Sequence, residues 1–296
     1  MTVKKAVLAV AGFGTRFLPA TKAVAKELLP IVDKPIVQYL VEEIVQSGIR
    51  DIILVTRSGN HALADHFDSS RELEVHLEES GKLQLLECVQ AIAQMANIAV
   101  VRQGRHLPHG NGTPLLAAQR YLDQGEPFVY LFGDDLVLSK TPCIRQLIDV
   151  YQQHAPDGVI AFQEVPDAEI SRYAAAALQA GTDPGQVLSL VEKPAPETAA
   201  SNLAQLGRFL LPWRTIEILE EMSHRIEGKT EELYLTYANN QLCREGRVLA
   251  HVIEGKWLTT GDPLRYLKAN VEYALRHKEI GRAFAEYLWA LELEVE

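Results

Sequence analysis

The chain has 296 residues, of which 47% are hydrophobic and 23% are charged, and its formal net charge at pH 7 is −10. A chain of this length and apolar content can bury a large core, as one large or two small domains. No apolar run is long enough for a transmembrane helix, and residues 1–5 lead directly into a strand instead of a signal peptide. We therefore expect a cytoplasmic protein, and the acidic balance argues against nucleic acid or a membrane as its partner.

The three cysteines indicate no special chemistry. Cys88, Cys143 and Cys243 are odd in number and widely spaced. This pattern favours neither a disulfide framework nor a cysteine-based zinc site. We expect reduced, inert thiols.

The first predicted strand, Ala6–Ala11, ends in a glycine-rich loop. The strand is short, continuous and apolar, which is typical of a central strand in a parallel sheet. Gly12 and Gly14 follow it, and glycines let backbone N–H groups approach an anion closely. Three cations then follow within eleven residues of an otherwise acidic chain: Arg16, Lys22 and Lys26. The stretch predicts a phosphate-binding loop.

Two common phosphate-binding motifs do not fit this loop. A dinucleotide fingerprint needs a third glycine where Phe17 stands. A P-loop needs Gly-Lys-Ser or Gly-Lys-Thr, which residues 14–16 do not supply. From the glycines alone, a strand-to-helix turn with surface cations remains the alternative.

Strand-like and helix-like patterns alternate along the chain. The helical periodicities span Ile36–Gln46 and Ile144–Gln153, and the predicted strands are Ile52–Thr56, Ile98–Arg102, Phe128–Phe132 and Val159–Val165. This alternation predicts an α/β fold with a doubly wound, mostly parallel sheet. Ligands of such sheets bind outside the carboxyl ends of the strands. Three candidate positions fall there: Gly12–Arg16, Gln103 and Asp134.

The stretch from Gly12 to Tyr39, which begins Gly-Phe-Gly-Thr-Arg-Phe-Leu-Pro, resembles the signature of the sugar-nucleotide pyrophosphorylases, a nucleotidyltransferase family. Its resemblance is strongest to the branch of the bacterial UTP:glucose-1-phosphate uridylyltransferases. Further segments agree in the family's order: residues 68–74, 101–104, 133–135, 191–194, 207–209 and 271–277. The resemblance covers nearly the whole chain.

The resemblance implies a Rossmann-like fold and a reaction. A uridylyl group passes from UTP to glucose 1-phosphate, giving UDP-glucose and pyrophosphate, with Mg²⁺ as the cofactor. The chemistry needs no protein nucleophile, because the sugar phosphate oxygen attacks the α-phosphorus of UTP directly. We expect a single nucleotidyltransferase domain over residues 1–296, with a nucleotide-binding part (1–155), a smaller sugar-binding part (156–262) and C-terminal helices (263–296).

The resemblance also implies roles for the residues at the phosphate end. Gly12 and Gly14 shape the loop around the nucleotide. Arg16 holds the departing pyrophosphate and Lys26 contacts the nucleotide phosphates, so these two are the implied catalytic residues. Their cationic side chains suit the negative charge of the transferring phosphates.

The remaining nucleotide residues follow two other strands. Gln103 occupies the base-reading position, and its amide can both donate to and accept from uracil. Gly110 matches a glycine with which relatives approach the base. Asp134 follows the strand Phe128–Phe132 and is the implied Mg²⁺ ligand, while its neighbour Asp135 acts behind it. Without the resemblance, paired acids after a strand could equally be helix-capping residues.

The sugar side of the site is implied by the segment Glu192-Lys193-Pro194. The carboxylate of Glu192 can accept hydrogen bonds from sugar hydroxyls, and Lys193 can pair with the sugar phosphate. Glu232 is a further implied sugar contact, or alternatively an exposed helix glutamate. Ala174 lies in the family's sugar-site segment, where relatives carry glycine and where a methyl group could crowd a backbone contact.

The sequence departs from the family at the metal site. Relatives complete the Mg²⁺ site with a second aspartate, and Thr259 stands at that position. A hydroxyl is a neutral and weaker ligand, so the metal would rest on Asp134, substrate phosphates and water, or Asp262 would substitute. Other replacements are Ala25 for a proline, Ala174 for a glycine, Thr113 for a histidine and Tyr237 for an aspartate.

These departures leave alternatives to the uridylyltransferase open. One is a non-catalytic paralogue that binds a nucleotide or UDP-sugar as a regulatory subunit. Another is the same reaction with a different sugar 1-phosphate. The family forms dimers or tetramers, and the amphipathic stretch Ile280–Leu291 could bury its apolar face either in a partner subunit of a homo-oligomer or on its own domain.

Overall fold

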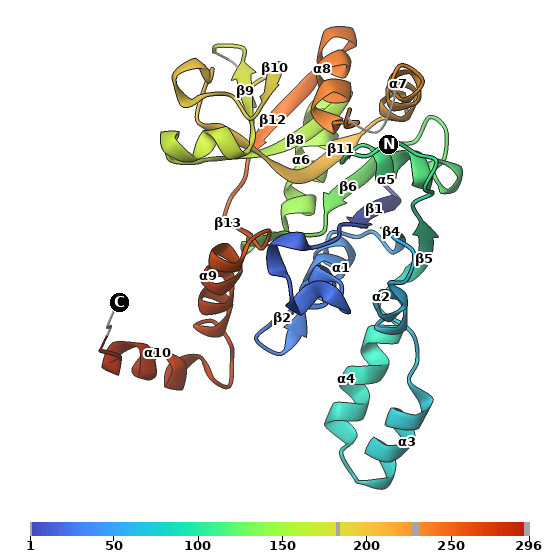
Figure 1. Cartoon of the computed structure of the whole chain (residues 1–296), viewed down its shortest axis with the longest axis vertical. Coiled ribbons are helices and arrows are strands. Elements are labelled where there is room, and N and C mark those ends of the chain that lie inside the picture. Colours follow the sequence, from blue (N-terminus) through green and yellow to red (C-terminus); the bar gives the residue numbers. More distant parts are fainter. Residues whose placement is uncertain (1, 182–183, 227–230, 293–296) are drawn as a thin grey trace.

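The structure is a computed structural model that describes residues 2–181, 184–226 and 231–292. Within these residues a nine-stranded sheet runs through the centre of the molecule (Figure 1), with the order β10-β9-β11-β6-β1-β4-β5, while β8 pairs with β11 and β12 pairs with β8. Its strands are β1 (Lys5–Val10), β4 (Asp51–Thr56), β5 (Asn97–Arg102), β6 (Phe128–Phe132), β8 (Gly158–Glu164), β9 (Ala174–Leu178), β10 (Val187–Glu192), β11 (Leu203–Leu211) and β12 (Val248–Val252).

Two small sheets and ten α-helices complete the described fold. The small sheets pair β2 (Pro30–Ile31) with β3 (Lys34–Pro35), and β7 (Asp135–Leu138) with β13 (Lys256–Thr259). The helices are α1 (Ile36–Gln46), α2 (His61–Asp65), α3 (Arg71–Glu79), α4 (Leu83–Ala93), α5 (Thr113–Ala118), α6 (Cys143–His154), α7 (Arg214–Ser223), α8 (Leu235–Glu245), α9 (Pro263–Ala274) and α10 (Gly281–Ala290).

The half of the sheet that contains β1, β4, β5 and β6 is parallel. Strand β1 pairs in parallel with both β4 and β6, and β4 pairs in parallel with β5. The other half contains antiparallel pairs, because β11 runs against β6, β8 and β9, and β10 runs against β9. The short connection between β9 and β10 explains their direction, since parallel neighbours need a much longer crossover. The predicted α/β fold is confirmed, as are the predicted strands and both helical periodicities.

Alternating side chains of β1 bury the two faces of the sheet. Ala6, Leu8 and Val10 pack into one apolar cluster with residues of α1 and α6. Val7 packs into the other cluster with residues of α5, α7 and α8. Helices therefore cover both faces, as a doubly wound sheet requires.

The carboxyl ends of the parallel strands bring separate segments together. The register aligns Val10 with Thr56, and Thr56 with Arg102. The glycine loop after β1, the residue after β4 and Gln103 after β5 therefore leave the sheet at one edge. The turn after β6 reaches the same edge, because β6 runs parallel to β1.

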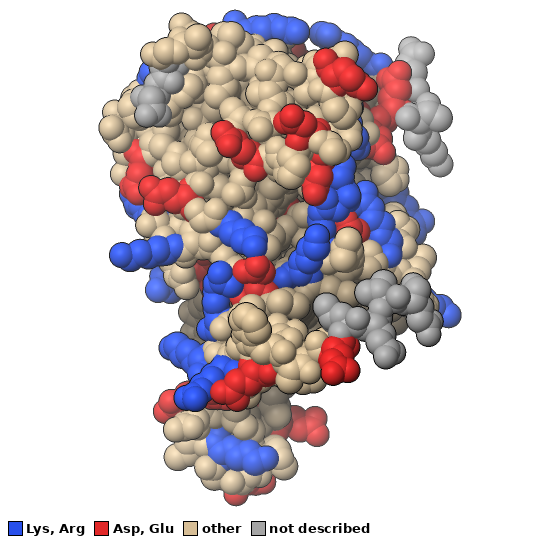
Figure 2. Space-filling view, turned by 90° about the vertical axis from the view of Figure 1, so that its left-hand side faces the viewer, with Lys and Arg blue, Asp and Glu red and all other residues tan. Residues whose placement is uncertain are grey.

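Three parts of the chain extend from the sheet. The hairpin of α3 and α4 projects downward in Figure 1, and α9 and α10 lie to one side. Helix α10 buries Gly281 alone, and Trp289 is 90% exposed. In Figure 2, the face that is on the left in Figure 1 carries basic and acidic side chains interspersed. No helix among the described residues is long and apolar enough to cross a membrane.

Arg208 forms the central polar contact of the core. Its side chain is fully buried and makes two hydrogen bonds to the Glu43 carboxylate of α1, at 2.8 and 3.0 Å. It also donates to the carbonyl oxygens of Asp135 (2.6 Å) and Gly207 (3.0 Å). The register of β11 shifts between Gln205 and Phe209, where this side chain leaves the strand. Arg208 therefore joins α1, β7 and β11.

Removing this guanidinium leaves buried acceptors without a partner. We expect Arg208→Ala to lower the free energy of unfolding by about 3–5 kcal/mol, because a buried ion pair broken on one side leaves an uncompensated charge. The control is Arg145→Ala, which removes a surface pair with Asp149 on α6 and costs about 0.5 kcal/mol. Urea unfolding of both variants measures the difference. Equal losses in the two variants would contradict a structural role for Arg208.

Candidate active site

The glycine loop wraps around the stem of Lys26. Gly14 has φ +64°, and a β-carbon there would lie 3.1 Å from Thr21 and 3.2 Å from Lys26. A β-carbon at Gly12 would lie 3.4 Å from the Cε of Lys26. The hydroxyl of Thr21 donates to the carbonyl of Gly14 at 2.7 Å and closes the loop. Close packing and a left-handed backbone thus explain why glycine stands at position 14.

Lys26 and Asp134 form an ion pair at the sheet edge. The Nζ of Lys26 lies 2.6 Å from Oδ2 of Asp134, and their side chains are 18% and 28% exposed. Burial lowers the pKa of Lys26, but the surrounding carboxylates, Asp134 foremost, together leave it raised. Burial raises the pKa of Asp134, but the Lys26 ammonium, a backbone hydrogen bond and Arg16 together leave it lowered. Both groups are therefore charged at neutral pH.

Arg16 and Thr259 lie beside this pair. Arg16 donates to the carbonyl of Gly261 at 3.2 Å. A β-carbon at Gly261 would lie 3.2 Å from the Asp134 carboxylate, 3.5 Å from the Thr259 hydroxyl and 3.6 Å from the Arg16 guanidinium. The N–H of Thr260 donates to the carbonyl of Asp134 at 2.6 Å and ties the two segments together. The structure thus brings Thr259 to Asp134, as the sequence alignment predicts.

Two nearby carboxylates, those of Asp135 and Asp262, are engaged elsewhere. Asp262 caps α9 by accepting from the N–H of Arg265 at 3.0 Å, and it forms ion pairs with Arg265 and Arg172. The carboxylate of Asp135 accepts from the N–H of Gly207 and from the indole of Trp257, both at 2.9 Å. Asp262 is therefore not placed to replace the missing second aspartate.

The side chains at Asp134 offer Mg²⁺ two oxygen ligands. Within the described residues, no group of three or more His, Cys, Asp or Glu side chains could hold a metal. The carboxylate of Asp134 and the hydroxyl of Thr259 are both oxygen donors, which Mg²⁺ prefers, and this ion commonly keeps several water and phosphate ligands. The residues present fit a Mg²⁺ ion whose other ligands come from substrate and water.

The base-side residues form a loop pinned to a distant segment. Gln103 extends β5, and its N–H donates to the carbonyl of Thr56 at 2.8 Å. Gly110 has φ +136°, and a β-carbon there would lie 2.3 Å from the carbonyl oxygen of Leu233. The N–H of Gly112 also donates to Leu233, at 2.9 Å. Glycine is required here by the Leu233 backbone, and its approach to a base stays a prediction.

Thr113 has a structural role in the same loop. Its side chain is fully buried, and its hydroxyl donates to the carbonyl of Pro108 at 2.7 Å. The threonine that stands in place of the expected histidine therefore stabilises the loop through a buried hydrogen bond.

The sugar-side residues meet at the end of β10. Glu192 pairs with Ala174 in the antiparallel register, and Ala174 is buried. The carboxylate of Glu192 accepts from the hydroxyl of Thr236 at 2.6 Å. Lys193 has φ +47°, and its N–H donates to the carbonyl of Tyr173 at 3.0 Å. The structure places Glu192, Lys193 and Ala174 together, as expected from the sequence.

Glu232 lies before α8 and not within it. It forms an isolated bridge with His109, next to Gly110. Glu232 is exposed, as the alternative expected, but it lies outside a helix, because α8 begins at Leu235. Glu232 belongs to the segment that joins the base-side loop to the sugar side.

The structure adds two residues to which the sequence gave no role. Arg57 follows β4, and its guanidinium lies 5.1 Å from the ring centroid of Phe13 in the glycine loop. Its buried Nε has no hydrogen-bond partner within the described residues. The sequence could have indicated Arg57 as a site residue, because it directly follows a parallel strand, as Gln103 does after β5.

Glu27 is the second added residue. Its side chain is 1% exposed and lies 3.8 Å from the Nζ of Lys26. Burial raises the pKa of Glu27 to about 7, although the charge of Lys26 acts in the opposite direction. Its Oε2 has no hydrogen-bond partner within the described residues. Lys26 is thus flanked by two carboxyl groups, of which only Asp134 makes a close ion pair.

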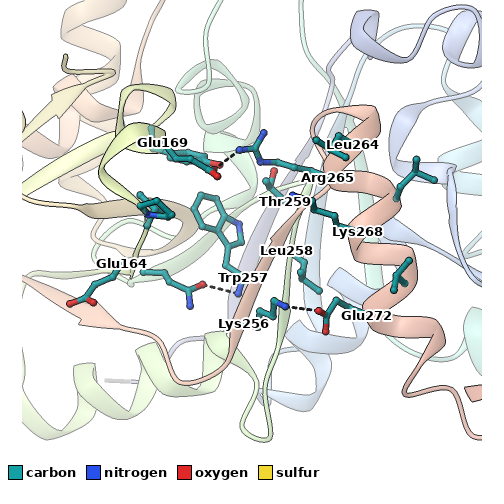
Figure 3. Close-up of a pocket in the computed structure, with 16 residues that line it drawn as sticks. Glu164, Glu169, Lys256, Trp257, Leu258, Thr259, Leu264, Arg265, Lys268 and Glu272 are labelled. Carbon is teal, nitrogen blue, oxygen red and sulfur yellow. Dashed lines mark hydrogen bonds and ion pairs between the residues drawn. The ribbon is translucent and has the colours of Figure 1, made fainter. Parts of the chain in front are cut away.

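A separate pocket of about 630 Å³ lies between α9 and the segment around β8. Figure 3 shows Trp257, Leu258 and Arg265 along its walls and Glu169 at its rim, paired with Arg265. Of the residues expected at the active site, Thr259 alone lines it. We therefore do not assign this pocket to the substrates.

Known proteins resemble the chain over almost its whole length. The family described as nucleotidyl transferase matches residues 5–276. The UTP–glucose-1-phosphate uridylyltransferase of Staphylococcus epidermidis is 42% identical, covering 98% of this chain and 99% of the relative. The enzyme of that name called YngB, from Bacillus subtilis, is 41% identical over 97% of this chain and 94% of its own.

A solved structure gives the same picture in three dimensions. The UTP-bound UGPase from Acinetobacter baumannii aligns with a TM-score of 0.89 at 33% identity, covering 98% of this chain and 100% of that one. The agreement in fold extends over both halves of the sheet.

Glu27 gives the folded protein a pH-dependent stability. Its folded pKa of about 7 lies above the ordinary value of 4.5, so the folded state binds this proton more tightly than the unfolded chain. Stability is then highest below pH 4.5 and falls as pH rises to about 7, by up to about 3 kcal/mol for this group. Glu27→Gln, which is neutral at every pH, removes this loss. Urea unfolding between pH 5 and pH 8 measures it, and parallel pH profiles for the two proteins would contradict the assignment.

Proposed function

The chain belongs to the nucleotidyl transferase family, and from this premise we propose that it transfers the uridylyl group of UTP to glucose 1-phosphate, giving UDP-glucose and pyrophosphate. One observation carries the proposal. Arg16 and Asp134 lie beside Gly261, and Lys26 pairs with Asp134, at the carboxyl edge of a parallel sheet. The identity of 42% with the Staphylococcus epidermidis uridylyltransferase, over nearly the whole length of both chains, supports the choice of substrates.

In this mechanism an oxygen of the sugar phosphate attacks the α-phosphorus of UTP. The new P–O bond forms as the bond to the β-phosphate oxygen breaks, and that electron pair leaves with pyrophosphate. The protein contributes position and charge. Arg16 binds the leaving pyrophosphate, Lys26 binds the nucleotide phosphates, and the N–H groups of the loop at Gly12 and Gly14 hold them in line. Gln103 and the loop at Gly110 orient the uracil.

The proposal includes Mg²⁺ held by Asp134 and the hydroxyl of Thr259. When bound, this ion neutralises phosphate charge. In the free protein the Nζ of Lys26 donates to Oδ2 of Asp134 at 2.6 Å. Binding of the nucleotide therefore assists binding of the metal, since phosphate offers Lys26 another anionic partner.

On the sugar side, Glu192 and Glu232 accept hydrogen bonds from sugar hydroxyls, and Lys193 pairs with the sugar phosphate. The backbone at Ala174 borders this subsite. The register that pairs Ala174 with Glu192 supports the assignment, because it puts both at one end of the same strand pair.

We also propose that the protein works in the cytoplasm as a homo-oligomer. Its three cysteines are free thiols, which supports a reducing compartment. Helix α10 supports self-association, because Tyr287 is 59% exposed and Trp289 is 90% exposed there. Exposed aromatic side chains are common at subunit interfaces.

The function is tested most directly at Arg16. In a pyrophosphate-release assay with UTP and glucose 1-phosphate, we expect Arg16→Ala to lower kcat at least about 100-fold, because it removes charge stabilisation in the transition state. Arg50→Ala is the matched control, since Arg50 precedes β4 at the opposite edge of the same sheet. Both variants should keep the melting temperature of the wild type. An unchanged rate in Arg16→Ala would remove this residue from the mechanism.

Thr259 tests the metal site. We expect Thr259→Asp to lower the Mg²⁺ concentration for half-maximal rate, and Thr259→Val to raise it, because a carboxylate is a stronger Mg²⁺ ligand than a hydroxyl and a methyl group is none. Rates measured across a Mg²⁺ series for the three proteins give the comparison. If neither variant changes the metal dependence, Thr259 is not a metal ligand. A wild type that binds UTP but turns over no sugar phosphate until Thr259→Asp is made would favour the regulatory paralogue.

A further inference from the structure

Tyr234 lies at the centre of the sugar-side cluster. The Nζ of Lys193 lies 5.7 Å from the centroid of its ring. The nearby Glu232 carboxylate raises the pKa of Tyr234 to about 12, so the phenol stays protonated. The ring of Tyr237 contacts it edge-on at 5.7 Å. One aromatic side chain therefore presents its face to Lys193 and has the Glu232 carboxylate beside it.

The backbone around Tyr234 is held from both halves of the site. The N–H of Leu233 donates to His109 at 2.6 Å, and the N–H of Leu235 donates to the side chain of Asn111 at 2.7 Å. The next residue, Thr236, donates to Glu192. Tyr234 is thus fixed between the loop that carries Gly110 and the end of β10. Its ring has a defined position before any ligand binds.

The contacts of Tyr234 leave its two neighbours available to a ligand. The Nζ of Lys193 is 3.8 Å from the nearest Glu192 oxygen, beyond hydrogen-bond distance. The ring face attracts the ammonium without using its N–H donors in a directed bond. A carboxylate has about four lone-pair sites, so Glu232 can accept from the phenol and still accept from a ligand.

We propose that Tyr234 is a positioning residue of the sugar subsite, which holds Lys193 for the phosphate of a hexose 1-phosphate and Glu232 for a hydroxyl of the same sugar. The edge-on contact with Tyr237 fixes the orientation of the Tyr234 ring. This inference rests on the proposed function and deepens it. Tyr234 belongs to none of the motifs described in the sequence.

The test separates sugar recognition from nucleotide recognition. Isothermal titration of UDP-glucose and of UDP into each protein gives the affinity that the glucose moiety adds. Tyr234→Phe keeps the ring and loses the hydroxyl, so we expect the affinity for UDP-glucose to fall about fivefold to tenfold while that for UDP is unchanged. Tyr234→Leu also loses the ring face and should show a larger loss. Tyr121→Leu, the same change at a tyrosine that is 49% exposed and has no part in the site, should change neither affinity.

Kinetics and a double variant test the two contacts. Tyr234→Leu should raise the KM for glucose 1-phosphate and leave that for UTP unchanged, and Tyr234→Phe should restore part of the loss. If the hydroxyl acts through Glu232, adding Tyr234→Phe to Glu232→Gln should cost no further affinity for UDP-glucose.

Two results would overturn the proposal. One is an equal loss for UDP and UDP-glucose, which would mean general loosening of the fold. The other is an unchanged ratio of the two affinities in Tyr234→Leu. If the proposed function fails, the wild type will release no pyrophosphate. The titrations are independent of that result, because they measure ligand binding and need no reaction.

Discussion

The buried guanidinium of Arg208 is the contact on which the geometry of the site depends. It binds Glu43 on α1 and the carbonyl of Asp135, which directly follows Asp134. The Asp135 carboxylate in turn holds Trp257 on β13. Pairing of β7 with β13 then places Thr259 opposite Asp135 in register. A charge buried in the core thereby sets where the proposed metal ligands stand, since a buried guanidinium tolerates few arrangements of its acceptors.

Positive and negative side chains lie next to one another in the candidate site. Lys26 lies near the carboxyl groups of both Asp134 and Glu27, and Arg16 donates to the carbonyl of Gly261. With no ligand, the Lys26–Asp134 pair satisfies both charges in a partly buried place. Nucleotide phosphates and a divalent cation carry the opposite charges to these two groups, so each offers one member of the pair a new partner. This exchange gives a physical reason for metal and nucleotide to bind together.

The segment before α8 couples the two halves of the site. It bonds to the base-side loop through Leu233 and to the sugar side through Thr236. Glu232 and Tyr234 lie between those two anchors. One short stretch therefore contacts both the loop that carries Gly110 and the end of β10.

The sequence by itself determined the local elements and the phosphate loop. The predicted helix Ile36–Gln46 has the bounds of α1, and the strand Phe128–Phe132 has those of β6, because burial periodicity within one element is a local property. The left-handed backbone at Gly14 is local as well. Arg16, Gln103 and Asp134 could be placed together because parallel strands end at one edge, while their roles and that of Lys26 came from the family resemblance.

Only the tertiary structure decided how distant segments meet. Register across strands placed Ala174 beside Glu192 and Thr259 opposite Asp135, next to Asp134, and a helix cap engaged Asp262 away from the site. Tyr234 and Glu27 gained their roles from neighbours far along the chain or from burial. No local pattern carries that information, because long-range pairing is chosen by the packing of the whole core and not by the residues on either side.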